Sequence, residues 1–228
     1  VVMRPVQRGA CPQDADGNDV AFTEYMQARR ALIERLGECC SYCEMQLDAS
    51  LAVEHVQPKK PPGAAAALPE RELAWGNFLL GCTNCNSIKG DTDVVLGDYL
   101  WPDRDDTYHC LRYSEGGLVQ SVPGPTQVQA DRLIALVGLD RTPDTARASD
   151  RRWLNRREAW DIAVRAKDRL ARCPQEDMKD QIIDTAKAKG FWSVWATVFY
   201  DDVDMLARLM AAHPGTRTTY FASLNPPA

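Results

Sequence analysis

Two C-x-x-C pairs constrain what this chain can fold into more than any other feature of its sequence. Cys40 and Cys43 form the first pair, and Cys82 and Cys85 form the second. This spacing lets four thiolates bind one tetrahedral zinc ion. Four sulfur ligands leave no open position, so such a zinc ion is structural and catalysis must come from other residues. Cys39 could compete for the place of Cys40, but the x-x spacing favours Cys40.

The rest of the composition favours metal binding over disulfides. The chain has eight cysteines, enough for several disulfides, but its first residues lack the apolar core of a secretory signal. A single C-x-x-C pair can also be a redox motif, whereas two pairs favour zinc. No apolar run approaches the roughly 20 residues that cross a bilayer. We therefore expect a cytoplasmic protein without membrane contact, whose natural chain begins at Met3.

The residues around the cysteine pairs predict a helix, a short strand and a hairpin. Residues 20–36 have helical periodicity, and Gly37 is a natural stop. Residues 51–56 form a β-prone run, and a helical turn is expected directly after Cys85. Residues 107–122 alternate around two glycines, which predicts a hairpin.

From about residue 127 onward the pattern is helical. One helix is expected over 150–172, with Trp153, Trp160 and Val164 as a narrow apolar stripe and arginines on the opposite side. Further helices are expected over three segments: 175–189, 191–198 and 205–210. Four tryptophans at helical spacing are expected in the core or at a partner contact: Trp153, Trp160, Trp192 and Trp195.

The motifs around the cysteines resemble those of the HNH nucleases, whose fold is called ββα-metal. The shared order is C-x-x-C, an acid followed by His, Asn before a pair of leucines, C-x-x-C followed by His or Asn, and then Lys. In this chain the acid is Glu54, where Asp is commoner, and Asn86 stands where many members have His. Adjacent residues of a regular strand point to opposite faces. Glu54 and His55 can therefore share one site only if the strand ends, bends or presents its edge there.

The resemblance implies a role for each of these residues in phosphodiester hydrolysis. His55 is the expected general base, since an imidazole can accept a proton near neutral pH, and Asn77 is expected to orient it. Glu54 and Asn86 offer the oxygen ligands that a catalytic Mg²⁺ or Mn²⁺ prefers. Lys89, three residues after Asn86, shares its helical face and could hold a phosphate oxygen.

The expected fold is therefore α+β, built around an HNH core of the ββα-metal type that a zinc ion staples together. An N-terminal helical segment would cover residues 3–37, the nuclease core with a hairpin extension 38–126, and a C-terminal helical domain 127–228. His109 and His213 are expected to be structural, with His213 at a helix C-terminus.

The charge distribution bears on the expected partner. The chain has 27 basic and 32 acidic residues and a net charge of −5, which argues against coating nucleic acid by bulk charge. Arg151, Arg165 and Arg169 could track a DNA backbone, or could form the charged outer face of a helical bundle. The chain start and the run 190–199 resemble HNH proteins encoded beside an ATPase in antiphage systems such as Septu. That resemblance implies an ATPase partner that delivers the nuclease to DNA.

Two other functions remain open from the sequence. The same cysteines could staple a non-catalytic zinc module that presents a binding surface, although such a module needs none of Glu54, His55, Asn77 and Asn86. An RNA-cleaving nuclease would share the whole site and differ only in its substrate.

Overall fold

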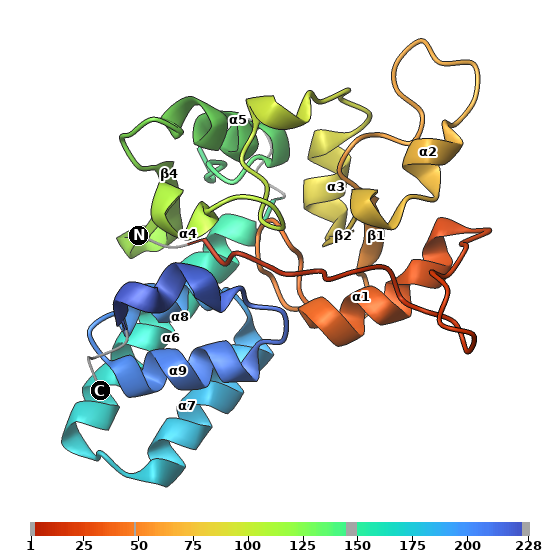
Figure 1. Ribbon diagram of the computed structural model, residues 1–228. Coiled ribbons are helices and arrows are strands. Elements are labelled where there is room, and N and C mark those ends of the chain that lie inside the picture. Colours follow the sequence, from red (N-terminus) through yellow and green to blue (C-terminus); the bar gives the residue numbers. More distant parts are fainter. Residues whose placement is uncertain (1–2, 48, 145–149, 225–228) are drawn as a thin grey trace.

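Two short antiparallel strands and a helix lie at the centre of the region that carries both cysteine pairs. The computed structural model describes residues 3–47, 49–144 and 150–224 (Figure 1), so Val1 and Val2 lie outside it. Strand β1 (Ala52–His55) pairs with β2 (Phe78–Gly81), with His55 opposite Phe78. Helix α3 (Thr83–Lys89) follows β2 directly. The expected strand and the helical turn at Cys85 are confirmed, and two short helical elements separate the strands along the chain.

The predicted N-terminal helix is present but shorter than its periodicity suggested. A 3-10 turn, η1 (Tyr25–Ala28), leads into α1 (Arg29–Leu36). Leu32 and Leu36 are buried, which confirms the inward face of this helix. Gly37 ends it with a φ of 81°, a conformation that favours glycine.

The hairpin is confirmed within narrower bounds. Strands β3 (Leu111–Ser114) and β4 (Leu118–Ser121) pair antiparallel across a turn that contains Gly116 and Gly117. Helix α4 (Thr107–Cys110) precedes the pair, and α5 (Gln127–Val137) packs against β4 and α3. The remaining short elements of the front half are α2 (Pro69–Glu72), η2 (Trp75–Asn77), η3 (Leu96–Asp98) and η4 (Glu115–Gly117).

The C-terminal helices agree closely with the sequence prediction. They are α6 (Arg152–Arg172), α7 (Glu176–Lys189), α8 (Trp192–Val198) and α9 (Val203–Ala212), followed by the 3-10 segment η5 (Thr218–Leu224). Trp192 and Trp195 are buried, as expected. His213 caps α9, where its Nδ1 donates to the carbonyl of Leu209 at 2.8 Å.

The predicted apolar stripe of α6 is wrong. Val164 is 39% exposed, and Trp153 and Trp160 are only half-buried. The inward face instead carries two arginines, three alanines and one leucine: Arg152, Arg156, Ala159, Ala163, Ala166 and Leu170. Small side chains let α6 pack closely against α8 and the η4 turn. The large apolar side chains of this helix are therefore not its most buried ones.

The N-terminal residues lie beside the C-terminal ones. Val6 forms an isolated antiparallel bridge with Thr216, and Gln7 donates to the carbonyl of Gly215 at 2.7 Å. The buried Glu44 carboxylate accepts hydrogen bonds from the backbone of Arg4 and from both the backbone and the hydroxyl of Ser193. The first cysteine pair is thus joined to α8 and to the chain start.

The fold is mixed, with helices around two small antiparallel sheets, which agrees with the α+β prediction at that level. Within the described residues, each helix is either too short or too polar to cross a bilayer.

The turn at Gly117 provides a test of how closely the hairpin and α6 pack. A Cβ on Gly117 would lie 2.7 Å from the backbone N of Arg157, and its φ is 73°. Gly116 has a similar φ of 78°, but a Cβ there would meet nothing within 4 Å. We expect Gly117→Ala to lower the free energy of unfolding by about 3 kcal/mol and Gly116→Ala by about 1 kcal/mol. Equal losses in urea titrations of the two variants would contradict this packing.

Candidate functional site

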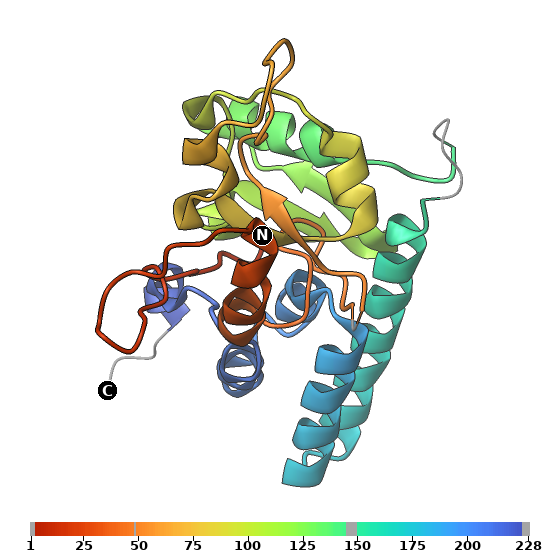
Figure 2. The same ribbon diagram turned by 90° about the vertical axis from the view of Figure 1, so that its right-hand side faces the viewer.

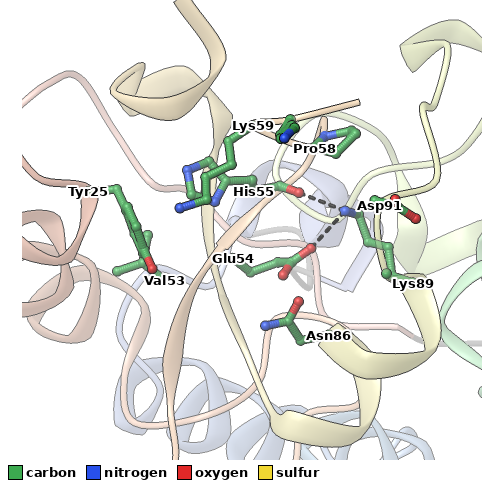
Figure 3. A pocket seen from close by; sticks show the side chains of 11 residues that line it. Tyr25, Val53, Glu54, His55, Pro58, Lys59, Asn86, Lys89 and Asp91 are labelled. Atoms are coloured by element: carbon green, nitrogen blue, oxygen red, sulfur yellow. Dashed lines mark hydrogen bonds and ion pairs between the residues drawn. The ribbon is translucent and has the colours of Figure 1, made fainter. Parts of the chain in front are cut away.

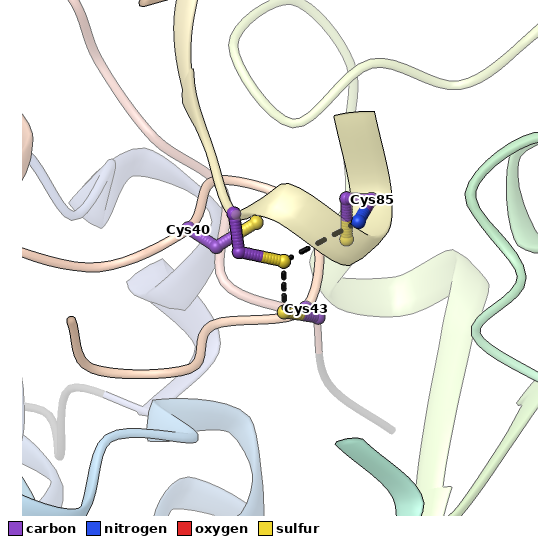
Figure 4. A group of neighbouring side chains, drawn as sticks. Cys40, Cys43 and Cys85 are labelled. Atoms are coloured by element: carbon purple, nitrogen blue, oxygen red, sulfur yellow. Dashed lines mark hydrogen bonds between the residues drawn. The ribbon is translucent and has the colours of Figure 1, made fainter. Parts of the chain in front are cut away.

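The four cysteines of the two pairs meet in one buried cluster. The Sγ atoms of Cys40, Cys43, Cys82 and Cys85 all lie within 4.8 Å of one another, and those of Cys43 and Cys82 are 3.6 Å apart (Figure 4). A tetrahedron with metal–sulfur distances of about 2.3 Å has sulfur–sulfur edges of about 3.8 Å. The cluster therefore has the size and the donor set of a zinc site, as the spacing predicted.

Local backbone contacts hold each pair in place. Around the first pair, the backbone N of Glu44 donates to the carbonyl of Cys40 at 2.9 Å, which closes a tight turn. In the second pair, Cys82 caps helix α3, and its Sγ accepts from the backbone N of Cys85 at 3.3 Å. Cys39 lies outside the cluster, where its Sγ accepts from the Arg4 guanidinium at 3.1 Å. The preference for Cys40 over Cys39 is confirmed.

A pocket of about 290 Å³ lies at the end of β1, beside α3. It brings together most of the residues that the sequence singled out (Figure 3). The predicted members are Glu54, His55, Asn86 and Lys89. Strand β1 ends at His55, and Glu54 and His55 both line this pocket. Adjacent residues of a regular strand point to opposite faces, so the end of the strand is what lets these two neighbours share one site.

Glu54 and Lys89 form a buried ion pair. The Oε1 atom of Glu54 lies 2.9 Å from Nζ of Lys89, and the two side chains are 3% and 2% exposed. Lys89 also donates to the carbonyl of His55 at 2.7 Å. Burial raises the pKa of the Glu54 carboxyl, while the neighbouring ammonium lowers it. Lys89 is thus already engaged by the site, and a contact with phosphate would require it to leave Glu54.

His55 is held as a neutral imidazole. Its Nε2 lies 3.0 Å from the carbonyl of Glu72, and its ring packs edge-on against Tyr25 and Phe78. A carbonyl only accepts, so Nε2 carries the proton and Nδ1 is the ring's acceptor. Burial, opposed by the hydrogen bond to Glu72 and reinforced by Lys59 and Lys89, lowers the pKa of His55.

Asn77 makes its side-chain hydrogen bonds to the backbone near His55 and none to the imidazole. Its Oδ1 accepts from the backbone N of Gln57, and its Nδ2 donates to the carbonyls of Gln57 and Arg71, each at 2.8 Å. Gln57 follows His55 by two residues, and Arg71 precedes the Glu72 carbonyl that binds the imidazole. Asn77 therefore fixes both segments between which His55 is held.

The oxygen donors of the pocket suit a divalent cation. Glu54 Oε1 is buried and accepts no hydrogen bond of good geometry, although it faces the Lys89 ammonium. Asn86 and Asp91 line the same pocket and supply further oxygens. Carboxylate and amide oxygens are the donor types that Mg²⁺ or Mn²⁺ prefers, and a cation bound at Oε1 of Glu54 would share that oxygen with, or displace, the Lys89 ammonium.

Sequence reasoning missed several members of this pocket. Asp91 stands two residues after Lys89 in the motif, and its position there was the available signal. Lys59 stands four residues after His55, and its Nζ lies 4.4 Å from the Tyr25 ring centre and 3.3 Å from Glu72 Oε1. Tyr25 comes from the N-terminal helix region, which no local pattern connects to the site.

The three arginines predicted to bind nucleic acid are exposed, and the two that lie within α6, Arg165 and Arg169, are not on its buried face. Figure 2 shows α6 running beside α7, away from the strand pair β1–β2. Arg151 lies just before the helix, whereas Arg165 and Arg169 lie in its distal half, and the pocket includes none of the three.

Comparisons with models of protein families, with curated proteins and with solved structures each find no match to this chain.

The cysteine cluster makes a direct prediction about metal content. We expect the purified protein to hold about one zinc ion per chain. Cys82→Ser should weaken zinc binding in a chelator competition by well over tenfold, because it removes a ligand, and should lower the melting temperature. Cys39→Ser is the matched control, since Cys39 is buried next to Cys40 but lies outside the cluster. Equal zinc affinities for the two variants would contradict the assignment.

Proposed function

We propose that this protein is a metal-dependent endonuclease of the HNH type that hydrolyses phosphodiester bonds in DNA. The observation that carries the proposal is the shared pocket of Glu54, His55 and Asn86, at the end of an antiparallel strand pair and on the helix that follows. A general base and oxygen donors for a cation thus lie together. A zinc module that only binds a partner has no need of this arrangement.

In the proposed reaction, His55 activates the attacking water. Its Nε2–H is used by the Glu72 carbonyl, so Nδ1 accepts the proton from water. The lowered pKa keeps the imidazole neutral and ready to accept at pH 7. Asn77 is a positioning residue, because it fixes the backbone on both sides of His55 without touching the ring.

Glu54 and Asn86 would hold the catalytic Mg²⁺ or Mn²⁺, with Asp91 as a further oxygen donor at the pocket wall. Such a cation neutralises the charge that grows on the phosphate and on the leaving oxygen. Lys89 favours the ionised form of Glu54 against the effect of burial and fixes the end of β1 through the carbonyl of His55. We assign the phosphate contact to Lys59 and Lys60 at the pocket rim, since they are far more exposed than Lys89.

DNA as the substrate, delivery by an ATPase partner and a role in antiphage defence belong to the same proposal. The net charge of −5 supports delivery by a partner over capture of DNA by bulk charge. The exposed Arg151, Arg165 and Arg169 then contact DNA or the partner beyond the pocket.

The nuclease proposal predicts metal-dependent cleavage of DNA that requires His55. We expect zinc-loaded protein to nick or linearise plasmid DNA with Mg²⁺ or Mn²⁺, and His55→Ala to lower the rate by about 10² to 10⁴. His109→Ala is the control, because His109 lies on the surface and does not line the pocket. A structured RNA in parallel tests the alternative substrate. Equal cleavage by both variants, or cleavage that survives EDTA, would contradict the proposal.

The position of the acid limb in the pH–rate profile gives a second prediction. The proposed base acts as the neutral imidazole, and burial lowers its pKa below the ordinary value of about 6.5. The value of kcat/KM should therefore rise with pH through a midpoint below 6.5 and stay level through pH 7 to 8. A midpoint above 7, measured at saturating Mg²⁺, would exclude a base in the environment of His55.

A further inference from the structure

Helix α6 buries two arginines against the centre of the molecule. Arg152 and Arg156 are 2% and 1% exposed, and they lie one helical turn apart on the face that packs inward. Removing a guanidinium from water is costly unless anions and hydrogen-bond acceptors replace the lost hydration. The acceptors and anions around these two side chains therefore indicate which part of the structure their positive charges stabilise.

Arg152 is bonded to the cysteine cluster. Its Nη1 donates to Sγ of Cys85 at 3.0 Å and to the carbonyl of Val137 at 2.8 Å. Its Nη2 donates to the carbonyl of Gly138 at 2.9 Å, and the guanidinium also pairs with the Asp150 carboxylate. One side chain thus connects a metal-binding sulfur, the end of α5 and the start of α6.

Arg156 lacks such a carboxylate. Its Nε donates to the carbonyl of Gly117 at 2.6 Å and its Nη2 to that of Leu139 at 2.9 Å. Among the described residues no carboxylate forms an ion pair with it, and the acidic groups that raise its pKa against the effect of burial are first Tyr113 and then Cys43 and Glu44. Burial raises the pKa of the Tyr113 hydroxyl well above its ordinary value, so Tyr113 supplies no negative charge at pH 7. Glu44 is itself occupied by Arg4 and Ser193. A metal-loaded cysteine cluster would therefore supply Arg156 with a buried counter-charge on the side of Cys43.

A zinc ion with four thiolates carries two net negative charges, because four S⁻ ligands outweigh one Zn²⁺. We infer that Arg152 and Arg156 are positioning residues of this metal centre, and that zinc binding and the docking of α6 are coupled through them. Arg152 donates a hydrogen bond to the Cys85 thiolate, and Arg156 adds a second buried positive charge. Removal of zinc frees the four sulfur atoms to separate, so Arg152 loses the fixed position of its Cys85 acceptor while its pair with Asp150 remains, and α6 loosens together with the cysteine pairs.

Hydrogen exchange on the full-length wild-type protein tests the coupling without any substitution. We expect removal of zinc by a chelator to speed amide exchange at least about tenfold in the first half of α6 as well as around the cysteine pairs. Exchange in α6 that stays unchanged while the cysteine pairs loosen would overturn the inference.

A spectroscopic experiment separates a bond to the metal centre from a role in packing alone. In the cobalt-substituted protein, loss of an N–H···S bond raises the energy of the sulfur lone pairs, so Arg152→Met should move the thiolate-to-cobalt charge-transfer band to longer wavelength. Arg152→Met should also weaken zinc binding by about 10- to 100-fold, with partial rescue in Arg152→Lys. Arg165→Met, on the exposed side of α6, is the matched control. An unmoved band together with unchanged zinc affinity in Arg152→Met would overturn the inference.

Discussion

Four buried thiolates cannot stay side by side as anions unless a cation lies among them, and this requirement organises the structure. The cluster of Cys40, Cys43, Cys82 and Cys85 fixes the turn before β1 to the start of α3. The cluster lies beside a sheet of only two short strands. Such a sheet is not stable alone, and a metal site can stabilise it. The pocket forms at the other end of the same strands and helix. A zinc ion bound in the cluster would therefore support the geometry of the pocket without taking part in the proposed chemistry.

Inside the pocket, the charged side chains already contact other groups of the protein in the absence of substrate. The Lys89 ammonium opposes the rise in the pKa of Glu54 that burial causes, although burial is the larger effect. The same ammonium binds the carbonyl of His55, so the acid and the proposed base are held by one side chain. Asn77 completes the frame from the opposite side through backbone groups only. Such preorganisation is what hydrolysis of a phosphodiester requires, because the barrier is lowered mainly by position and charge.

The sequence was informative where the pattern is local. The cysteine spacing, the β-prone run and the C-terminal helices each depend on residues close together in the chain, and the structure has them. The inward face of α6 was not predictable in this way, because Arg152 and Arg156 are buried against groups distant in sequence, such as Cys85 and Gly117. The place of Tyr25 in the pocket wall was not predicted for the same reason, because its pocket neighbours are distant in sequence. Site residues were found through a resemblance to HNH nucleases, whereas their contacts depend on the three-dimensional arrangement.

The central claim is that this chain holds two metals with separate tasks, and a crystal grown with Mn²⁺ tests it most directly. Anomalous scattering at the zinc and manganese edges distinguishes the two ions. The account predicts zinc among the four Sγ atoms and manganese between Glu54 and Asn86, with Lys89 beside it. A pocket that stays free of manganese at millimolar concentration, or manganese bound only at surface carboxylates, would contradict it.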